Sequence, residues 1–273
     1  MKSVLVTGCS SGIGRCIAEG LKEYDYKVIT TARKKEDIEN LSEAGFDVVK
    51  LDLNDSNSIH KTVETVLSKT DGKLYGLINN AAYGLSGAVE DLSREELRKQ
   101  FETNVFGTHE LTTLLLPVIR KQNEGRIIQI SSVLGFVTMK FRGAYCASKY
   151  ALESLSDALR YELKDTNIKV SLIEPGPITS EFRTNALNNY KNVIDKEQSY
   201  YKEEYAKIEK EMNAENYTPP FTLGPEAVLE KVIHALESDK PKARYYVTFP
   251  TYLFAIFKRM LPGVLLDKIL IRI

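Results

Sequence analysis

The sequence has few residues of the kinds that form metal sites and disulfide frameworks. Its 273 residues include three histidines and three cysteines, Cys9, Cys16 and Cys146. The cysteines show neither a CxxC pair nor the Cys/His spacing of a metal site, so we expect no bound metal. An odd number of scattered cysteines is typical of reducing compartments, and we expect the chain to be cytoplasmic.

An excess of charge of either sign is also missing. Lys plus Arg and Asp plus Glu number 37 each, and no basic stripe interleaved with aromatic residues runs along the chain. Nucleic acid is therefore not expected as a partner. The first residues lead directly into the strand-like run Ser3–Thr7, without a charged lead and a long apolar stretch, so we expect no secretion signal.

Short apolar runs alternate with helical patterns along most of the chain. This alternation predicts an α/β fold, a single doubly wound parallel-sheet (Rossmann) domain over residues 1–248. Amphipathic spacing predicts helices at about 97–118 and 143–165. The expected strands are 3–8, 26–31, 46–51, 74–80, 125–131, 168–174 and 244–248.

Two segments depart from this alternation. Residues 185–218 are polar and rich in Tyr, and a helical stripe of Tyr201, Tyr205, Ile208 and Met212 runs through them. We assign residues 185–222 to a substrate-loop insert and residues 249–273 to an apolar, basic tail. Neither segment is long enough to bury a core of its own.

A glycine-rich turn follows the first strand and opens the first helix, in the order Thr-Gly-Cys-Ser-Ser-Gly-Ile-Gly. Glycines at such a turn let the backbone approach a pyrophosphate, whose charge meets the helix N-terminus. An isolated glycine run is weak evidence, but its place between a strand and a helix strengthens it. The predicted nucleotide contacts are Gly8, Ser10, Ser11, Gly12, Ile13 and Gly14.

A cation follows the second strand, where Ala32 precedes Arg33 and Lys34. NAD enzymes commonly place Asp or Glu there to accept hydrogen bonds from the adenosine ribose. A guanidinium at this point suits the 2′-phosphate of NADP(H), which we expect as the cofactor. The alternative is a solvated loop in which these cations contact no ligand.

Polar residues also end the third and fourth strands. Asp52, with Leu53 beside it, could orient the adenine, and Asn80, Ala81 and Ala82 follow the fourth strand at the ligand-binding edge. Simpler roles remain open for both segments. The Asp could cap the next helix, and the Asn residues could form a turn.

Tyr145 and Lys149 are four residues apart and share one face of the predicted helix. A nearby ammonium lowers the pKa of a phenol and makes it a better proton exchanger at neutral pH. Ser132 ends the fifth strand and could hydrogen-bond a substrate oxygen beside Tyr145. Asn104 interrupts an apolar helical stretch, either as a satisfied buried polar group or as the holder of a water that serves Lys149.

In this order, these motifs resemble the short-chain dehydrogenase/reductases over residues 2–248. The dipeptide Ala32-Arg33 and the segments 173–177 and 221–227 resemble the hydroxysteroid/retinol-dehydrogenase-like branch, and within it bacterial NADP-dependent aldehyde reductases. The resemblance implies hydride transfer between the cofactor and a carbonyl/alcohol pair. It also implies a homodimer or homotetramer.

The resemblance implies roles for single residues as well. Tyr145 would be the acid/base, Ser132 the carbonyl orienter, Lys149 the partner of the phenol and the ribose, and Asn104 a relay member. The nicotinamide would be lined by Pro175, Gly176, Ile178 and Thr179. Ala82 departs from the family, which usually has Gly there, and its methyl could crowd the cofactor. Two other functions stay open, a 3-oxoacyl-thioester reductase and a non-catalytic NADP-binding sensor.

The tail does not suit a membrane span, which takes about 20 predominantly apolar residues. Lys258-Arg259 and Pro262-Gly263 interrupt it well before that length. It could pack beside the substrate cleft, lie on a membrane surface, or cover the core of its own subunit. We favour the cleft, because a lipophilic substrate needs apolar walls that the sheet does not supply.

Overall fold

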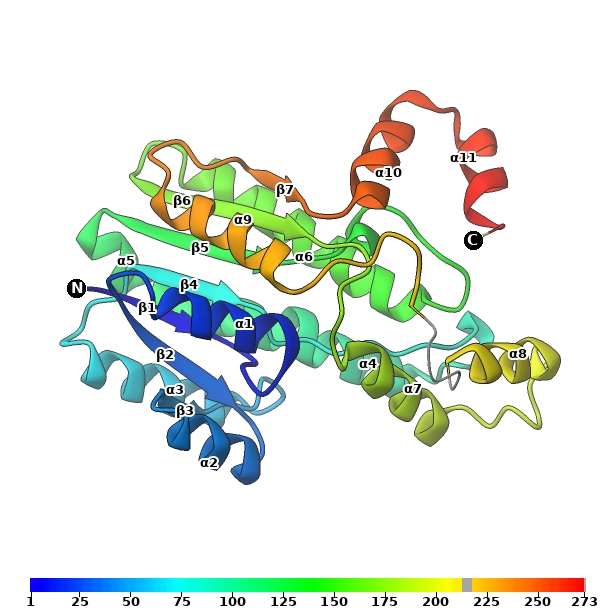
Figure 1. Ribbon diagram of the computed structural model, residues 1–273, viewed down its shortest axis with the longest axis horizontal. Helices are drawn as coiled ribbons and strands as arrows, with labels where there is room; N and C mark the ends of the chain where they lie inside the picture. The colour runs from blue at the N-terminus through cyan, green and yellow to red at the C-terminus, as the bar shows by residue number, and fades with distance from the viewer. Residues whose placement is uncertain (213–217, 273) are drawn as a thin grey trace.

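The structure, a computed structural model, describes residues 1–212 and 218–272, and over these residues the chain forms one sheet of seven parallel strands (Figure 1). The strand order is β3-β2-β1-β4-β5-β6-β7. The strands are β1 Lys2–Val6, β2 Tyr26–Ala32, β3 Asp47–Lys50, β4 Gly76–Asn79, β5 Gly125–Ile130, β6 Ile168–Glu174 and β7 Arg244–Tyr246. Each predicted strand is present with its ends within two residues, which confirms the doubly wound parallel fold.

The winding of the sheet reverses at β1, which pairs with β2 on one side and β4 on the other. The connections that leave β1 and β4 therefore diverge at the carboxyl ends of these strands. In open parallel sheets this divergence opens the crevice that binds ligands. The glycine-rich turn and the segment Asn80–Ala82 both lie at this point.

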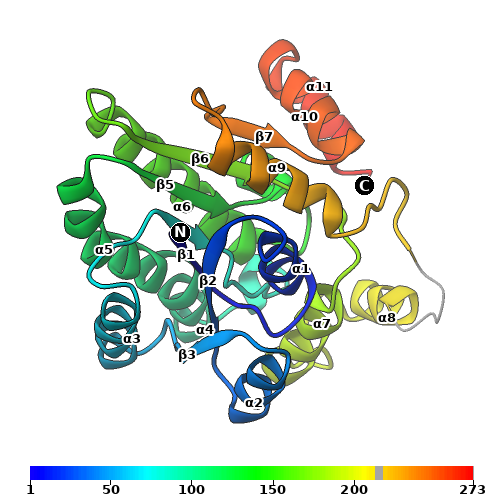
Figure 2. The ribbon, with the colours of Figure 1, turned by 60° about the vertical axis from the view of Figure 1, so that its left-hand side comes forward.

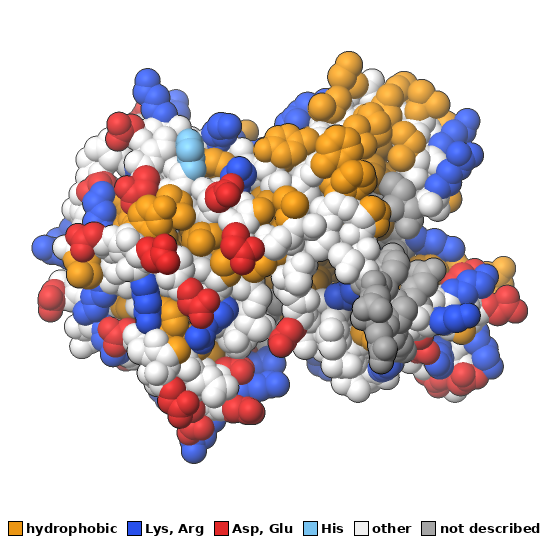
Figure 3. Space-filling model, viewed as in Figure 1, with side chains coloured by type: hydrophobic (Ala, Val, Ile, Leu, Met, Phe, Trp, Pro, Cys, Tyr) orange, Lys and Arg blue, Asp and Glu red, His pale blue; other side chains and the backbone are white. Residues whose placement is uncertain are grey.

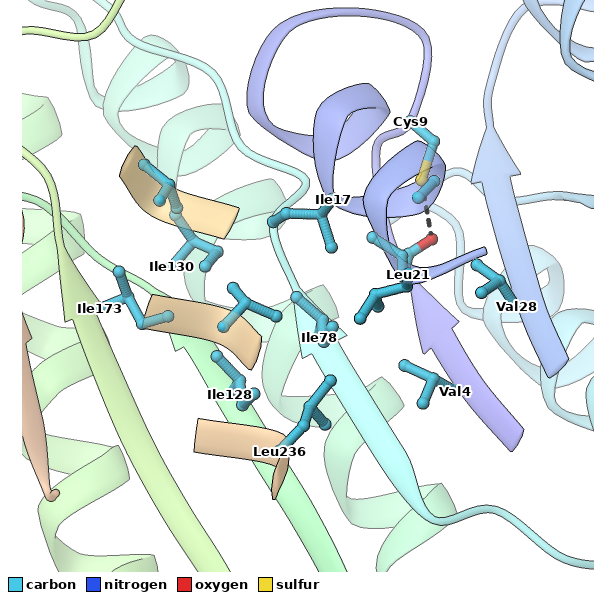
Figure 4. Packing of buried hydrophobic residues seen from close by; sticks show 14 of the residues in the cluster. Val4, Cys9, Ile17, Leu21, Val28, Ile78, Ile128, Ile130, Ile173 and Leu236 are labelled. Carbon is cyan, nitrogen blue, oxygen red and sulfur yellow. Dashed lines mark hydrogen bonds between the residues drawn. The ribbon is translucent and has the colours of Figure 1, made fainter. Parts of the chain in front are cut away.

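Helices cover both faces of the sheet (Figure 2). One face carries α1 (Gly12–Leu21), α2 (Lys35–Glu43) and α9 (Glu226–Glu237), and the core beneath them includes Ile17, Leu41 and Val232. The other face carries α3 (Ser56–Lys69), α5 (Thr108–Gln122) and α6 (Gly143–Glu162). Figure 4 shows the first core, in which Cys9 is fully buried and donates a hydrogen bond from Sγ to the carbonyl of Val6.

The helix predicted at 97–118 is not uniform. It consists of α4 (Arg94–Phe101), a π-helical turn η2 (Glu102–Gly107) and then α5. Gly107 packs so closely that a Cβ atom there would lie 2.0 Å from the carbonyl oxygen of Leu53. Amphipathic spacing cannot distinguish a wider turn from an α-helical one, and such turns occur frequently at functional sites. The helix predicted at 143–165 is present as α6.

The insert contains α7 (Phe182–Val193) and α8 (Lys202–Met212). Tyr205 is fully buried between these helices, in a small cluster with Ala88, Leu187, Tyr190 and Ile194. Tyr201 and Ile208 pack against this cluster, as the predicted helical stripe requires, and the side chain of Met212 lies outside the described part of the chain. Because Ala88 precedes the short turn η1 (Val89–Asp91), the insert completes its core with another part of the domain.

The tail forms α10 (Phe249–Met260) and α11 (Gly263–Leu270). Thr251 and Ala255 of α10 and Leu266 of α11 are buried, whereas Tyr252, Ile256 and other apolar residues are exposed. Figure 3 shows these apolar side chains gathered over the two helices. Within the described residues no helix has the length and apolar character needed to cross a membrane.

Candidate active site

The glycine-rich turn leaves no room for a side chain at its three glycines. Gly8 and Gly12 have positive φ angles, +69° and +56°, which L-residues rarely adopt. A Cβ atom on Gly14 would lie 2.1 Å from the carbonyl oxygen of Gly8. Ser11 precedes α1 without a capping side-chain hydrogen bond, so the first N–H groups of the helix can meet an anion. These features suit a dinucleotide pyrophosphate.

Thr7 and Asn80 hold this turn against the end of β4. Thr7 Oγ1 accepts hydrogen bonds from the backbone N–H groups of Asn80 and Ala81, both at 2.9 Å. Asn80 Nδ2 donates to the carbonyls of Thr7 at 2.9 Å and Gly8 at 3.0 Å. The predicted cofactor contact Asn80 therefore shapes the turn with its amide. Thr7 was missed as a functional residue, although it stands first in the motif.

The residues predicted at the adenosine end lie at the same edge of the sheet. Arg33 is exposed directly after β2 and forms no ion pair with any described residue. Asp52 accepts a hydrogen bond from the N–H of Asn54 at 3.0 Å, so one of its carboxylate oxygens forms a turn before α3. Leu53 is buried, and its carbonyl faces Gly107.

Asn104 lies in the π-helical turn η2 and is 1% exposed. Its Nδ2 donates to the carbonyl of Tyr83 and to Ser148 Oγ, both at 3.0 Å, and its Oδ1 accepts from the N–H of Tyr83 at 3.2 Å. Ser148 Oγ in turn donates to the carbonyl of Tyr145 at 2.8 Å. Asn104 is thus a satisfied buried group that joins the loop after β4 to α6, and its other expected role, holding a water that serves Lys149, stays a prediction.

Ser132, Tyr145 and Lys149 come together where β5 ends and α6 begins. Ser132 precedes the short turn η3 (Val133–Gly135) and accepts a hydrogen bond from the N–H of Leu134 at 3.1 Å. Its hydroxyl also lies near the phenol of Tyr145 and opposes the rise that burial causes in the tyrosine pKa. Ser132 therefore lies near Tyr145, although 13 residues separate them in the sequence.

Lys149 lies near Tyr145 and is anchored to the end of β5. Lys149 Nζ lies 5.8 Å from the ring centroid of Tyr145 and donates to the carbonyl of Ile130 at 2.7 Å. Burial raises the pKa of Tyr145 well above its ordinary value, so the phenol is protonated at neutral pH. Burial also lowers the pKa of Lys149 to about 8, and the carboxylate of Glu153 opposes this shift.

The segment after β6 spans the crevice. Pro175 accepts a hydrogen bond from the N–H of Val133 at 2.8 Å, and a Cβ on Gly176 would meet Thr248 Oγ1 at 2.1 Å. Further on, Ile178 packs against the core and Thr179 donates from its N–H to the carbonyl of Leu223 at 2.9 Å. The next residue, Ser180, lies against Gly12, since a Cβ built there would be 2.9 Å from Ser180 Cβ. The segment thus connects the tyrosine end of the crevice to the glycine-rich turn.

Phe182 covers Tyr145, with ring centroids 5.3 Å apart. Its ring also packs on Gly84, where an added Cβ would come within 2.7 Å of it. Phe182 begins α7 and remains 39% exposed, so it can contact both Tyr145 and a ligand. Sequence reasoning missed this residue, because nothing in its surroundings distinguishes it from other apolar residues of the insert.

A group of charged side chains connects the elements that carry the site. Arg244 of β7 forms ion pairs with Glu153, Asp157 and Glu174. Glu153 also accepts a hydrogen bond from Ser131 Oγ at 2.7 Å. Burial and the nearby Glu153 raise the pKa of Glu174 to about 8. These contacts connect α6, β6, β7 and the end of β5, the elements that carry Ser132, Lys149 and Pro175.

Solved structures with related folds contain either nicotinamide cofactor. A short-chain dehydrogenase/reductase from Burkholderia phymatum, 23% identical and with a TM-score of 0.75, is in complex with NAD; the match covers 93% of this chain and 91% of that one. An actinorhodin polyketide ketoreductase, 26% identical and with a TM-score of 0.71, is in complex with NADPH; the match covers 90% of this chain and 95% of that one. The cradle described above fits a nicotinamide dinucleotide, because its glycines and open helix N-terminus are the features that a pyrophosphate needs.

The short chain dehydrogenase family model matches residues 2–191. The chain is 45% identical over 269 residues to the uncharacterized oxidoreductase YbbO of Escherichia coli, which covers 98% of this chain and 94% of that protein. It is 37% identical to an NADPH-dependent 3-dehydrocapnine reductase of Ornithobacterium rhinotracheale, over 98% of this chain and 96% of that protein. A short-chain dehydrogenase structure from Streptomyces avermitilis superposes with a TM-score of 0.78 at 29% identity, over 98% and 93%. The chain belongs to the short-chain dehydrogenase/reductase family of oxidoreductases.

Proposed function

We propose that the protein is an NADP(H)-dependent oxidoreductase that reduces an aldehyde or ketone to the alcohol, and that its substrate is lipophilic. The observation that carries the proposal is the meeting of Ser132, Tyr145 and Lys149 beside a glycine cradle. A bound nicotinamide cofactor supplies the hydride. The remaining steps belong to side chains of this protein.

Tyr145 is the proton donor in this proposal. Because burial raises its pKa, the phenol carries its proton at neutral pH. A neutral phenol can donate that proton to a carbonyl oxygen as negative charge develops on it. The protonated phenol is the form that reduction requires.

Ser132 and Lys149 position the reacting groups. The Ser132 hydroxyl lies beside the phenol and can donate a second hydrogen bond to the same substrate oxygen. Lys149 would hold the nicotinamide ribose hydroxyls. Asn104 acts through Ser148 and the carbonyl of Tyr145, so we assign it to positioning the first turn of α6.

The preference for NADP(H) rests on Arg33. Its guanidinium is exposed directly after β2, and among the described residues it forms no ion pair that would compete with a 2′-phosphate. The 3-dehydrocapnine reductase to which the chain is similar is described as NADPH-dependent. We assign the remaining cofactor contacts to Gly8, Ser10, Ser11, Gly12, Ile13 and Gly14 of the turn, to Asp52, Leu53, Asn80, Ala81 and Ala82 at the strand ends, and to Pro175, Gly176, Ile178 and Thr179.

A lipophilic substrate suits the aromatic side chains near the crevice. Phe182 covers Tyr145, and the rings of Phe221 and Phe249 pack together with centroids 5.1 Å apart. Phe221 and Phe249 are each more than half exposed.

We also expect a cytoplasmic homodimer or homotetramer, in which the outer faces of α4, α5 and α6 pair. Light scattering measures the oligomeric state.

The decisive experiment replaces Tyr145 with Phe. Loss of one hydroxyl removes the proton donor but leaves the glycine cradle, so turnover should fall about 10²- to 10⁴-fold while NADPH binding persists. The measurements are NADPH consumption with a panel of aldehydes and ketones, and NADPH binding by fluorescence titration. Cys146→Ser is the matched control, because it changes the next residue and leaves the phenol in place. A wild-type protein that binds NADPH and consumes none would be a sensor.

A second candidate, a 3-oxoacyl-thioester reductase, uses the same residues and differs in its substrate. The same panel, extended with a 3-oxoacyl thioester, separates the two. A catalytic efficiency at least tenfold higher with the thioester than with the free aldehydes and ketones would favour this second function.

A further inference from the structure

Arg142 lies at the start of α6, three residues before Tyr145. Its guanidinium donates a hydrogen bond to Ser86 Oγ in the loop after β4. The two segments also meet through the backbone, because Gly87 N–H donates to the carbonyl of Phe141 at 2.9 Å. Arg142 therefore lies where this loop contacts the start of α6, the helix that carries Tyr145.

No carboxylate among the described residues pairs with Arg142, whose one hydrogen-bonding partner in that part of the chain is a neutral hydroxyl. The nearby charge of Arg183 has the same sign, and together with burial it lowers the pKa of Arg142. Arg244, also half-buried, contacts three acidic side chains. A cation removed from water without a counter-charge destabilises the protein, and an anion that binds there would relieve this cost.

The guanidinium is close to the reacting group. Its charge reaches the Tyr145 hydroxyl and partly offsets the rise in the tyrosine pKa. Phe182 contacts the Tyr145 ring on one side and Gly84 on the other, and Gly84 precedes Ser86 by two residues. These contacts link Arg142, through Ser86 and Gly84, to the Phe182 ring that covers Tyr145.

We propose that Arg142 binds an anionic group of the substrate, so that the preferred carbonyl compounds carry a carboxylate, sulfonate or phosphate a few bonds from the carbonyl carbon. The inference rests on the proposed reductase function and names its substrate class. A guanidinium suits this task, because its planar fork donates two parallel hydrogen bonds to such oxyanions. Arg142 precedes Tyr145 by three residues at the start of α6, so we place the anionic group a few bonds from the carbonyl carbon.

The test compares a 3-oxo carboxylate with its methyl ester of the same chain length, using NADPH consumption. The wild-type protein should favour the carboxylate. Arg142→Met should lower kcat/KM for the carboxylate roughly 10- to 100-fold more than for the ester, mainly through KM, because the change in the Tyr145 pKa affects both substrates alike. Arg142→Lys should restore part of the preference, since it returns the charge without the fork.

Lys140→Met is the matched control. Lys140 is an exposed cation two residues from Arg142, and it lies against the rings of Phe141 and Tyr201. The variant removes the same charge and should keep the carboxylate preference. An equal loss of preference in both variants would mean that the general field of the surface, rather than Arg142, selects the anion.

A binding measurement keeps the inference separate from catalysis. Butanoate, which has no carbonyl to reduce, should raise the melting temperature of the wild-type protein with NADPH bound, whereas butanamide should not. Arg142→Met should remove that increase. An ester reduced as well as the acid, without a butanoate effect, would overturn the inference and leave the reductase function standing. Absence of turnover with any carbonyl compound would instead overturn the reductase function.

Discussion

The glycine-rich turn and the C-terminal helices differ in how much their packing constrains the sequence. A Cβ on Gly14 would come within 2.1 Å of a backbone oxygen, whereas a Cβ on Gly263, at the start of α11, would meet no atom within 4 Å. The turn therefore accepts one residue type at each glycine. The exposed apolar residues of α10 and α11 face few such limits. The proposed cofactor site is therefore encoded in local spacing, whereas the proposed substrate surface depends on several segments of the chain.

The largest effect should come from placing the same methyl group in both regions. Gly14→Ala should nearly abolish NADPH binding, because its Cβ would overlap the carbonyl of Gly8 and the Asn80 amide that holds the turn. Gly263→Ala should change neither NADPH affinity nor melting temperature appreciably. Fluorescence titration and thermal unfolding measure both variants. Tight NADPH binding by Gly14→Ala would contradict the close contact described here.

The sequence was sufficient to predict the regions with tight local constraints. Strands, glycine-rich turn and the Ser132, Tyr145 and Lys149 set follow from spacing and residue type, because each requires particular side chains at fixed separations. The pairing of Thr7 with Asn80 could not be predicted, since it joins segments more than 70 residues apart. The same holds for Phe182 over Tyr145. The rise in the Tyr145 pKa depends on burial, which single-sequence reasoning cannot quantify.

Cofactor preference tests whether the exposed edge of the nucleotide site is as specific as its backbone cradle. Arg33→Asp should shift the preference from NADP(H) toward NAD(H), by roughly 100-fold in the ratio of kcat/KM values. The carboxylate repels a 2′-phosphate and accepts hydrogen bonds from free ribose hydroxyls. Lys34→Asp is the control, one residue further from the strand. A wild-type enzyme that already prefers NADH would refute the role assigned to Arg33.

The lowered pKa of the buried Lys149 predicts how activity depends on pH. Lys149 must be protonated to hold ribose hydroxyls, and with its pKa lowered to about 8, activity should fall as the pH rises through that value. The Glu153 carboxylate lies one helical turn from Lys149 and raises its pKa. Glu153→Gln should therefore move the alkaline limb to lower pH, by on the order of one unit.

Asp157→Asn provides the matched control for this prediction. Asp157 pairs with the same Arg244 but lies a further turn along α6 from Lys149. Its variant should leave the alkaline limb in place. Rates measured from pH 6 to 10 with saturating NADPH compare the three proteins. An equal displacement in both variants would assign the effect to disruption of Arg244.

The smallest expected effect concerns the tail, where the proposed contact with substrate depends on apolar surface alone. Phe249 begins α10 beside Thr248, which packs on Gly176, and its ring contacts Phe221. Phe249→Ala should raise KM several-fold for long-chain aldehydes and little for short ones, because half-exposed apolar surface contributes about 1 kcal/mol. Met260→Ser, at the far end of α10 and 76% exposed, is the control and should change neither KM. If both variants weaken binding to anionic liposomes and leave both KM values unchanged, the apolar surface contacts a membrane rather than the substrate.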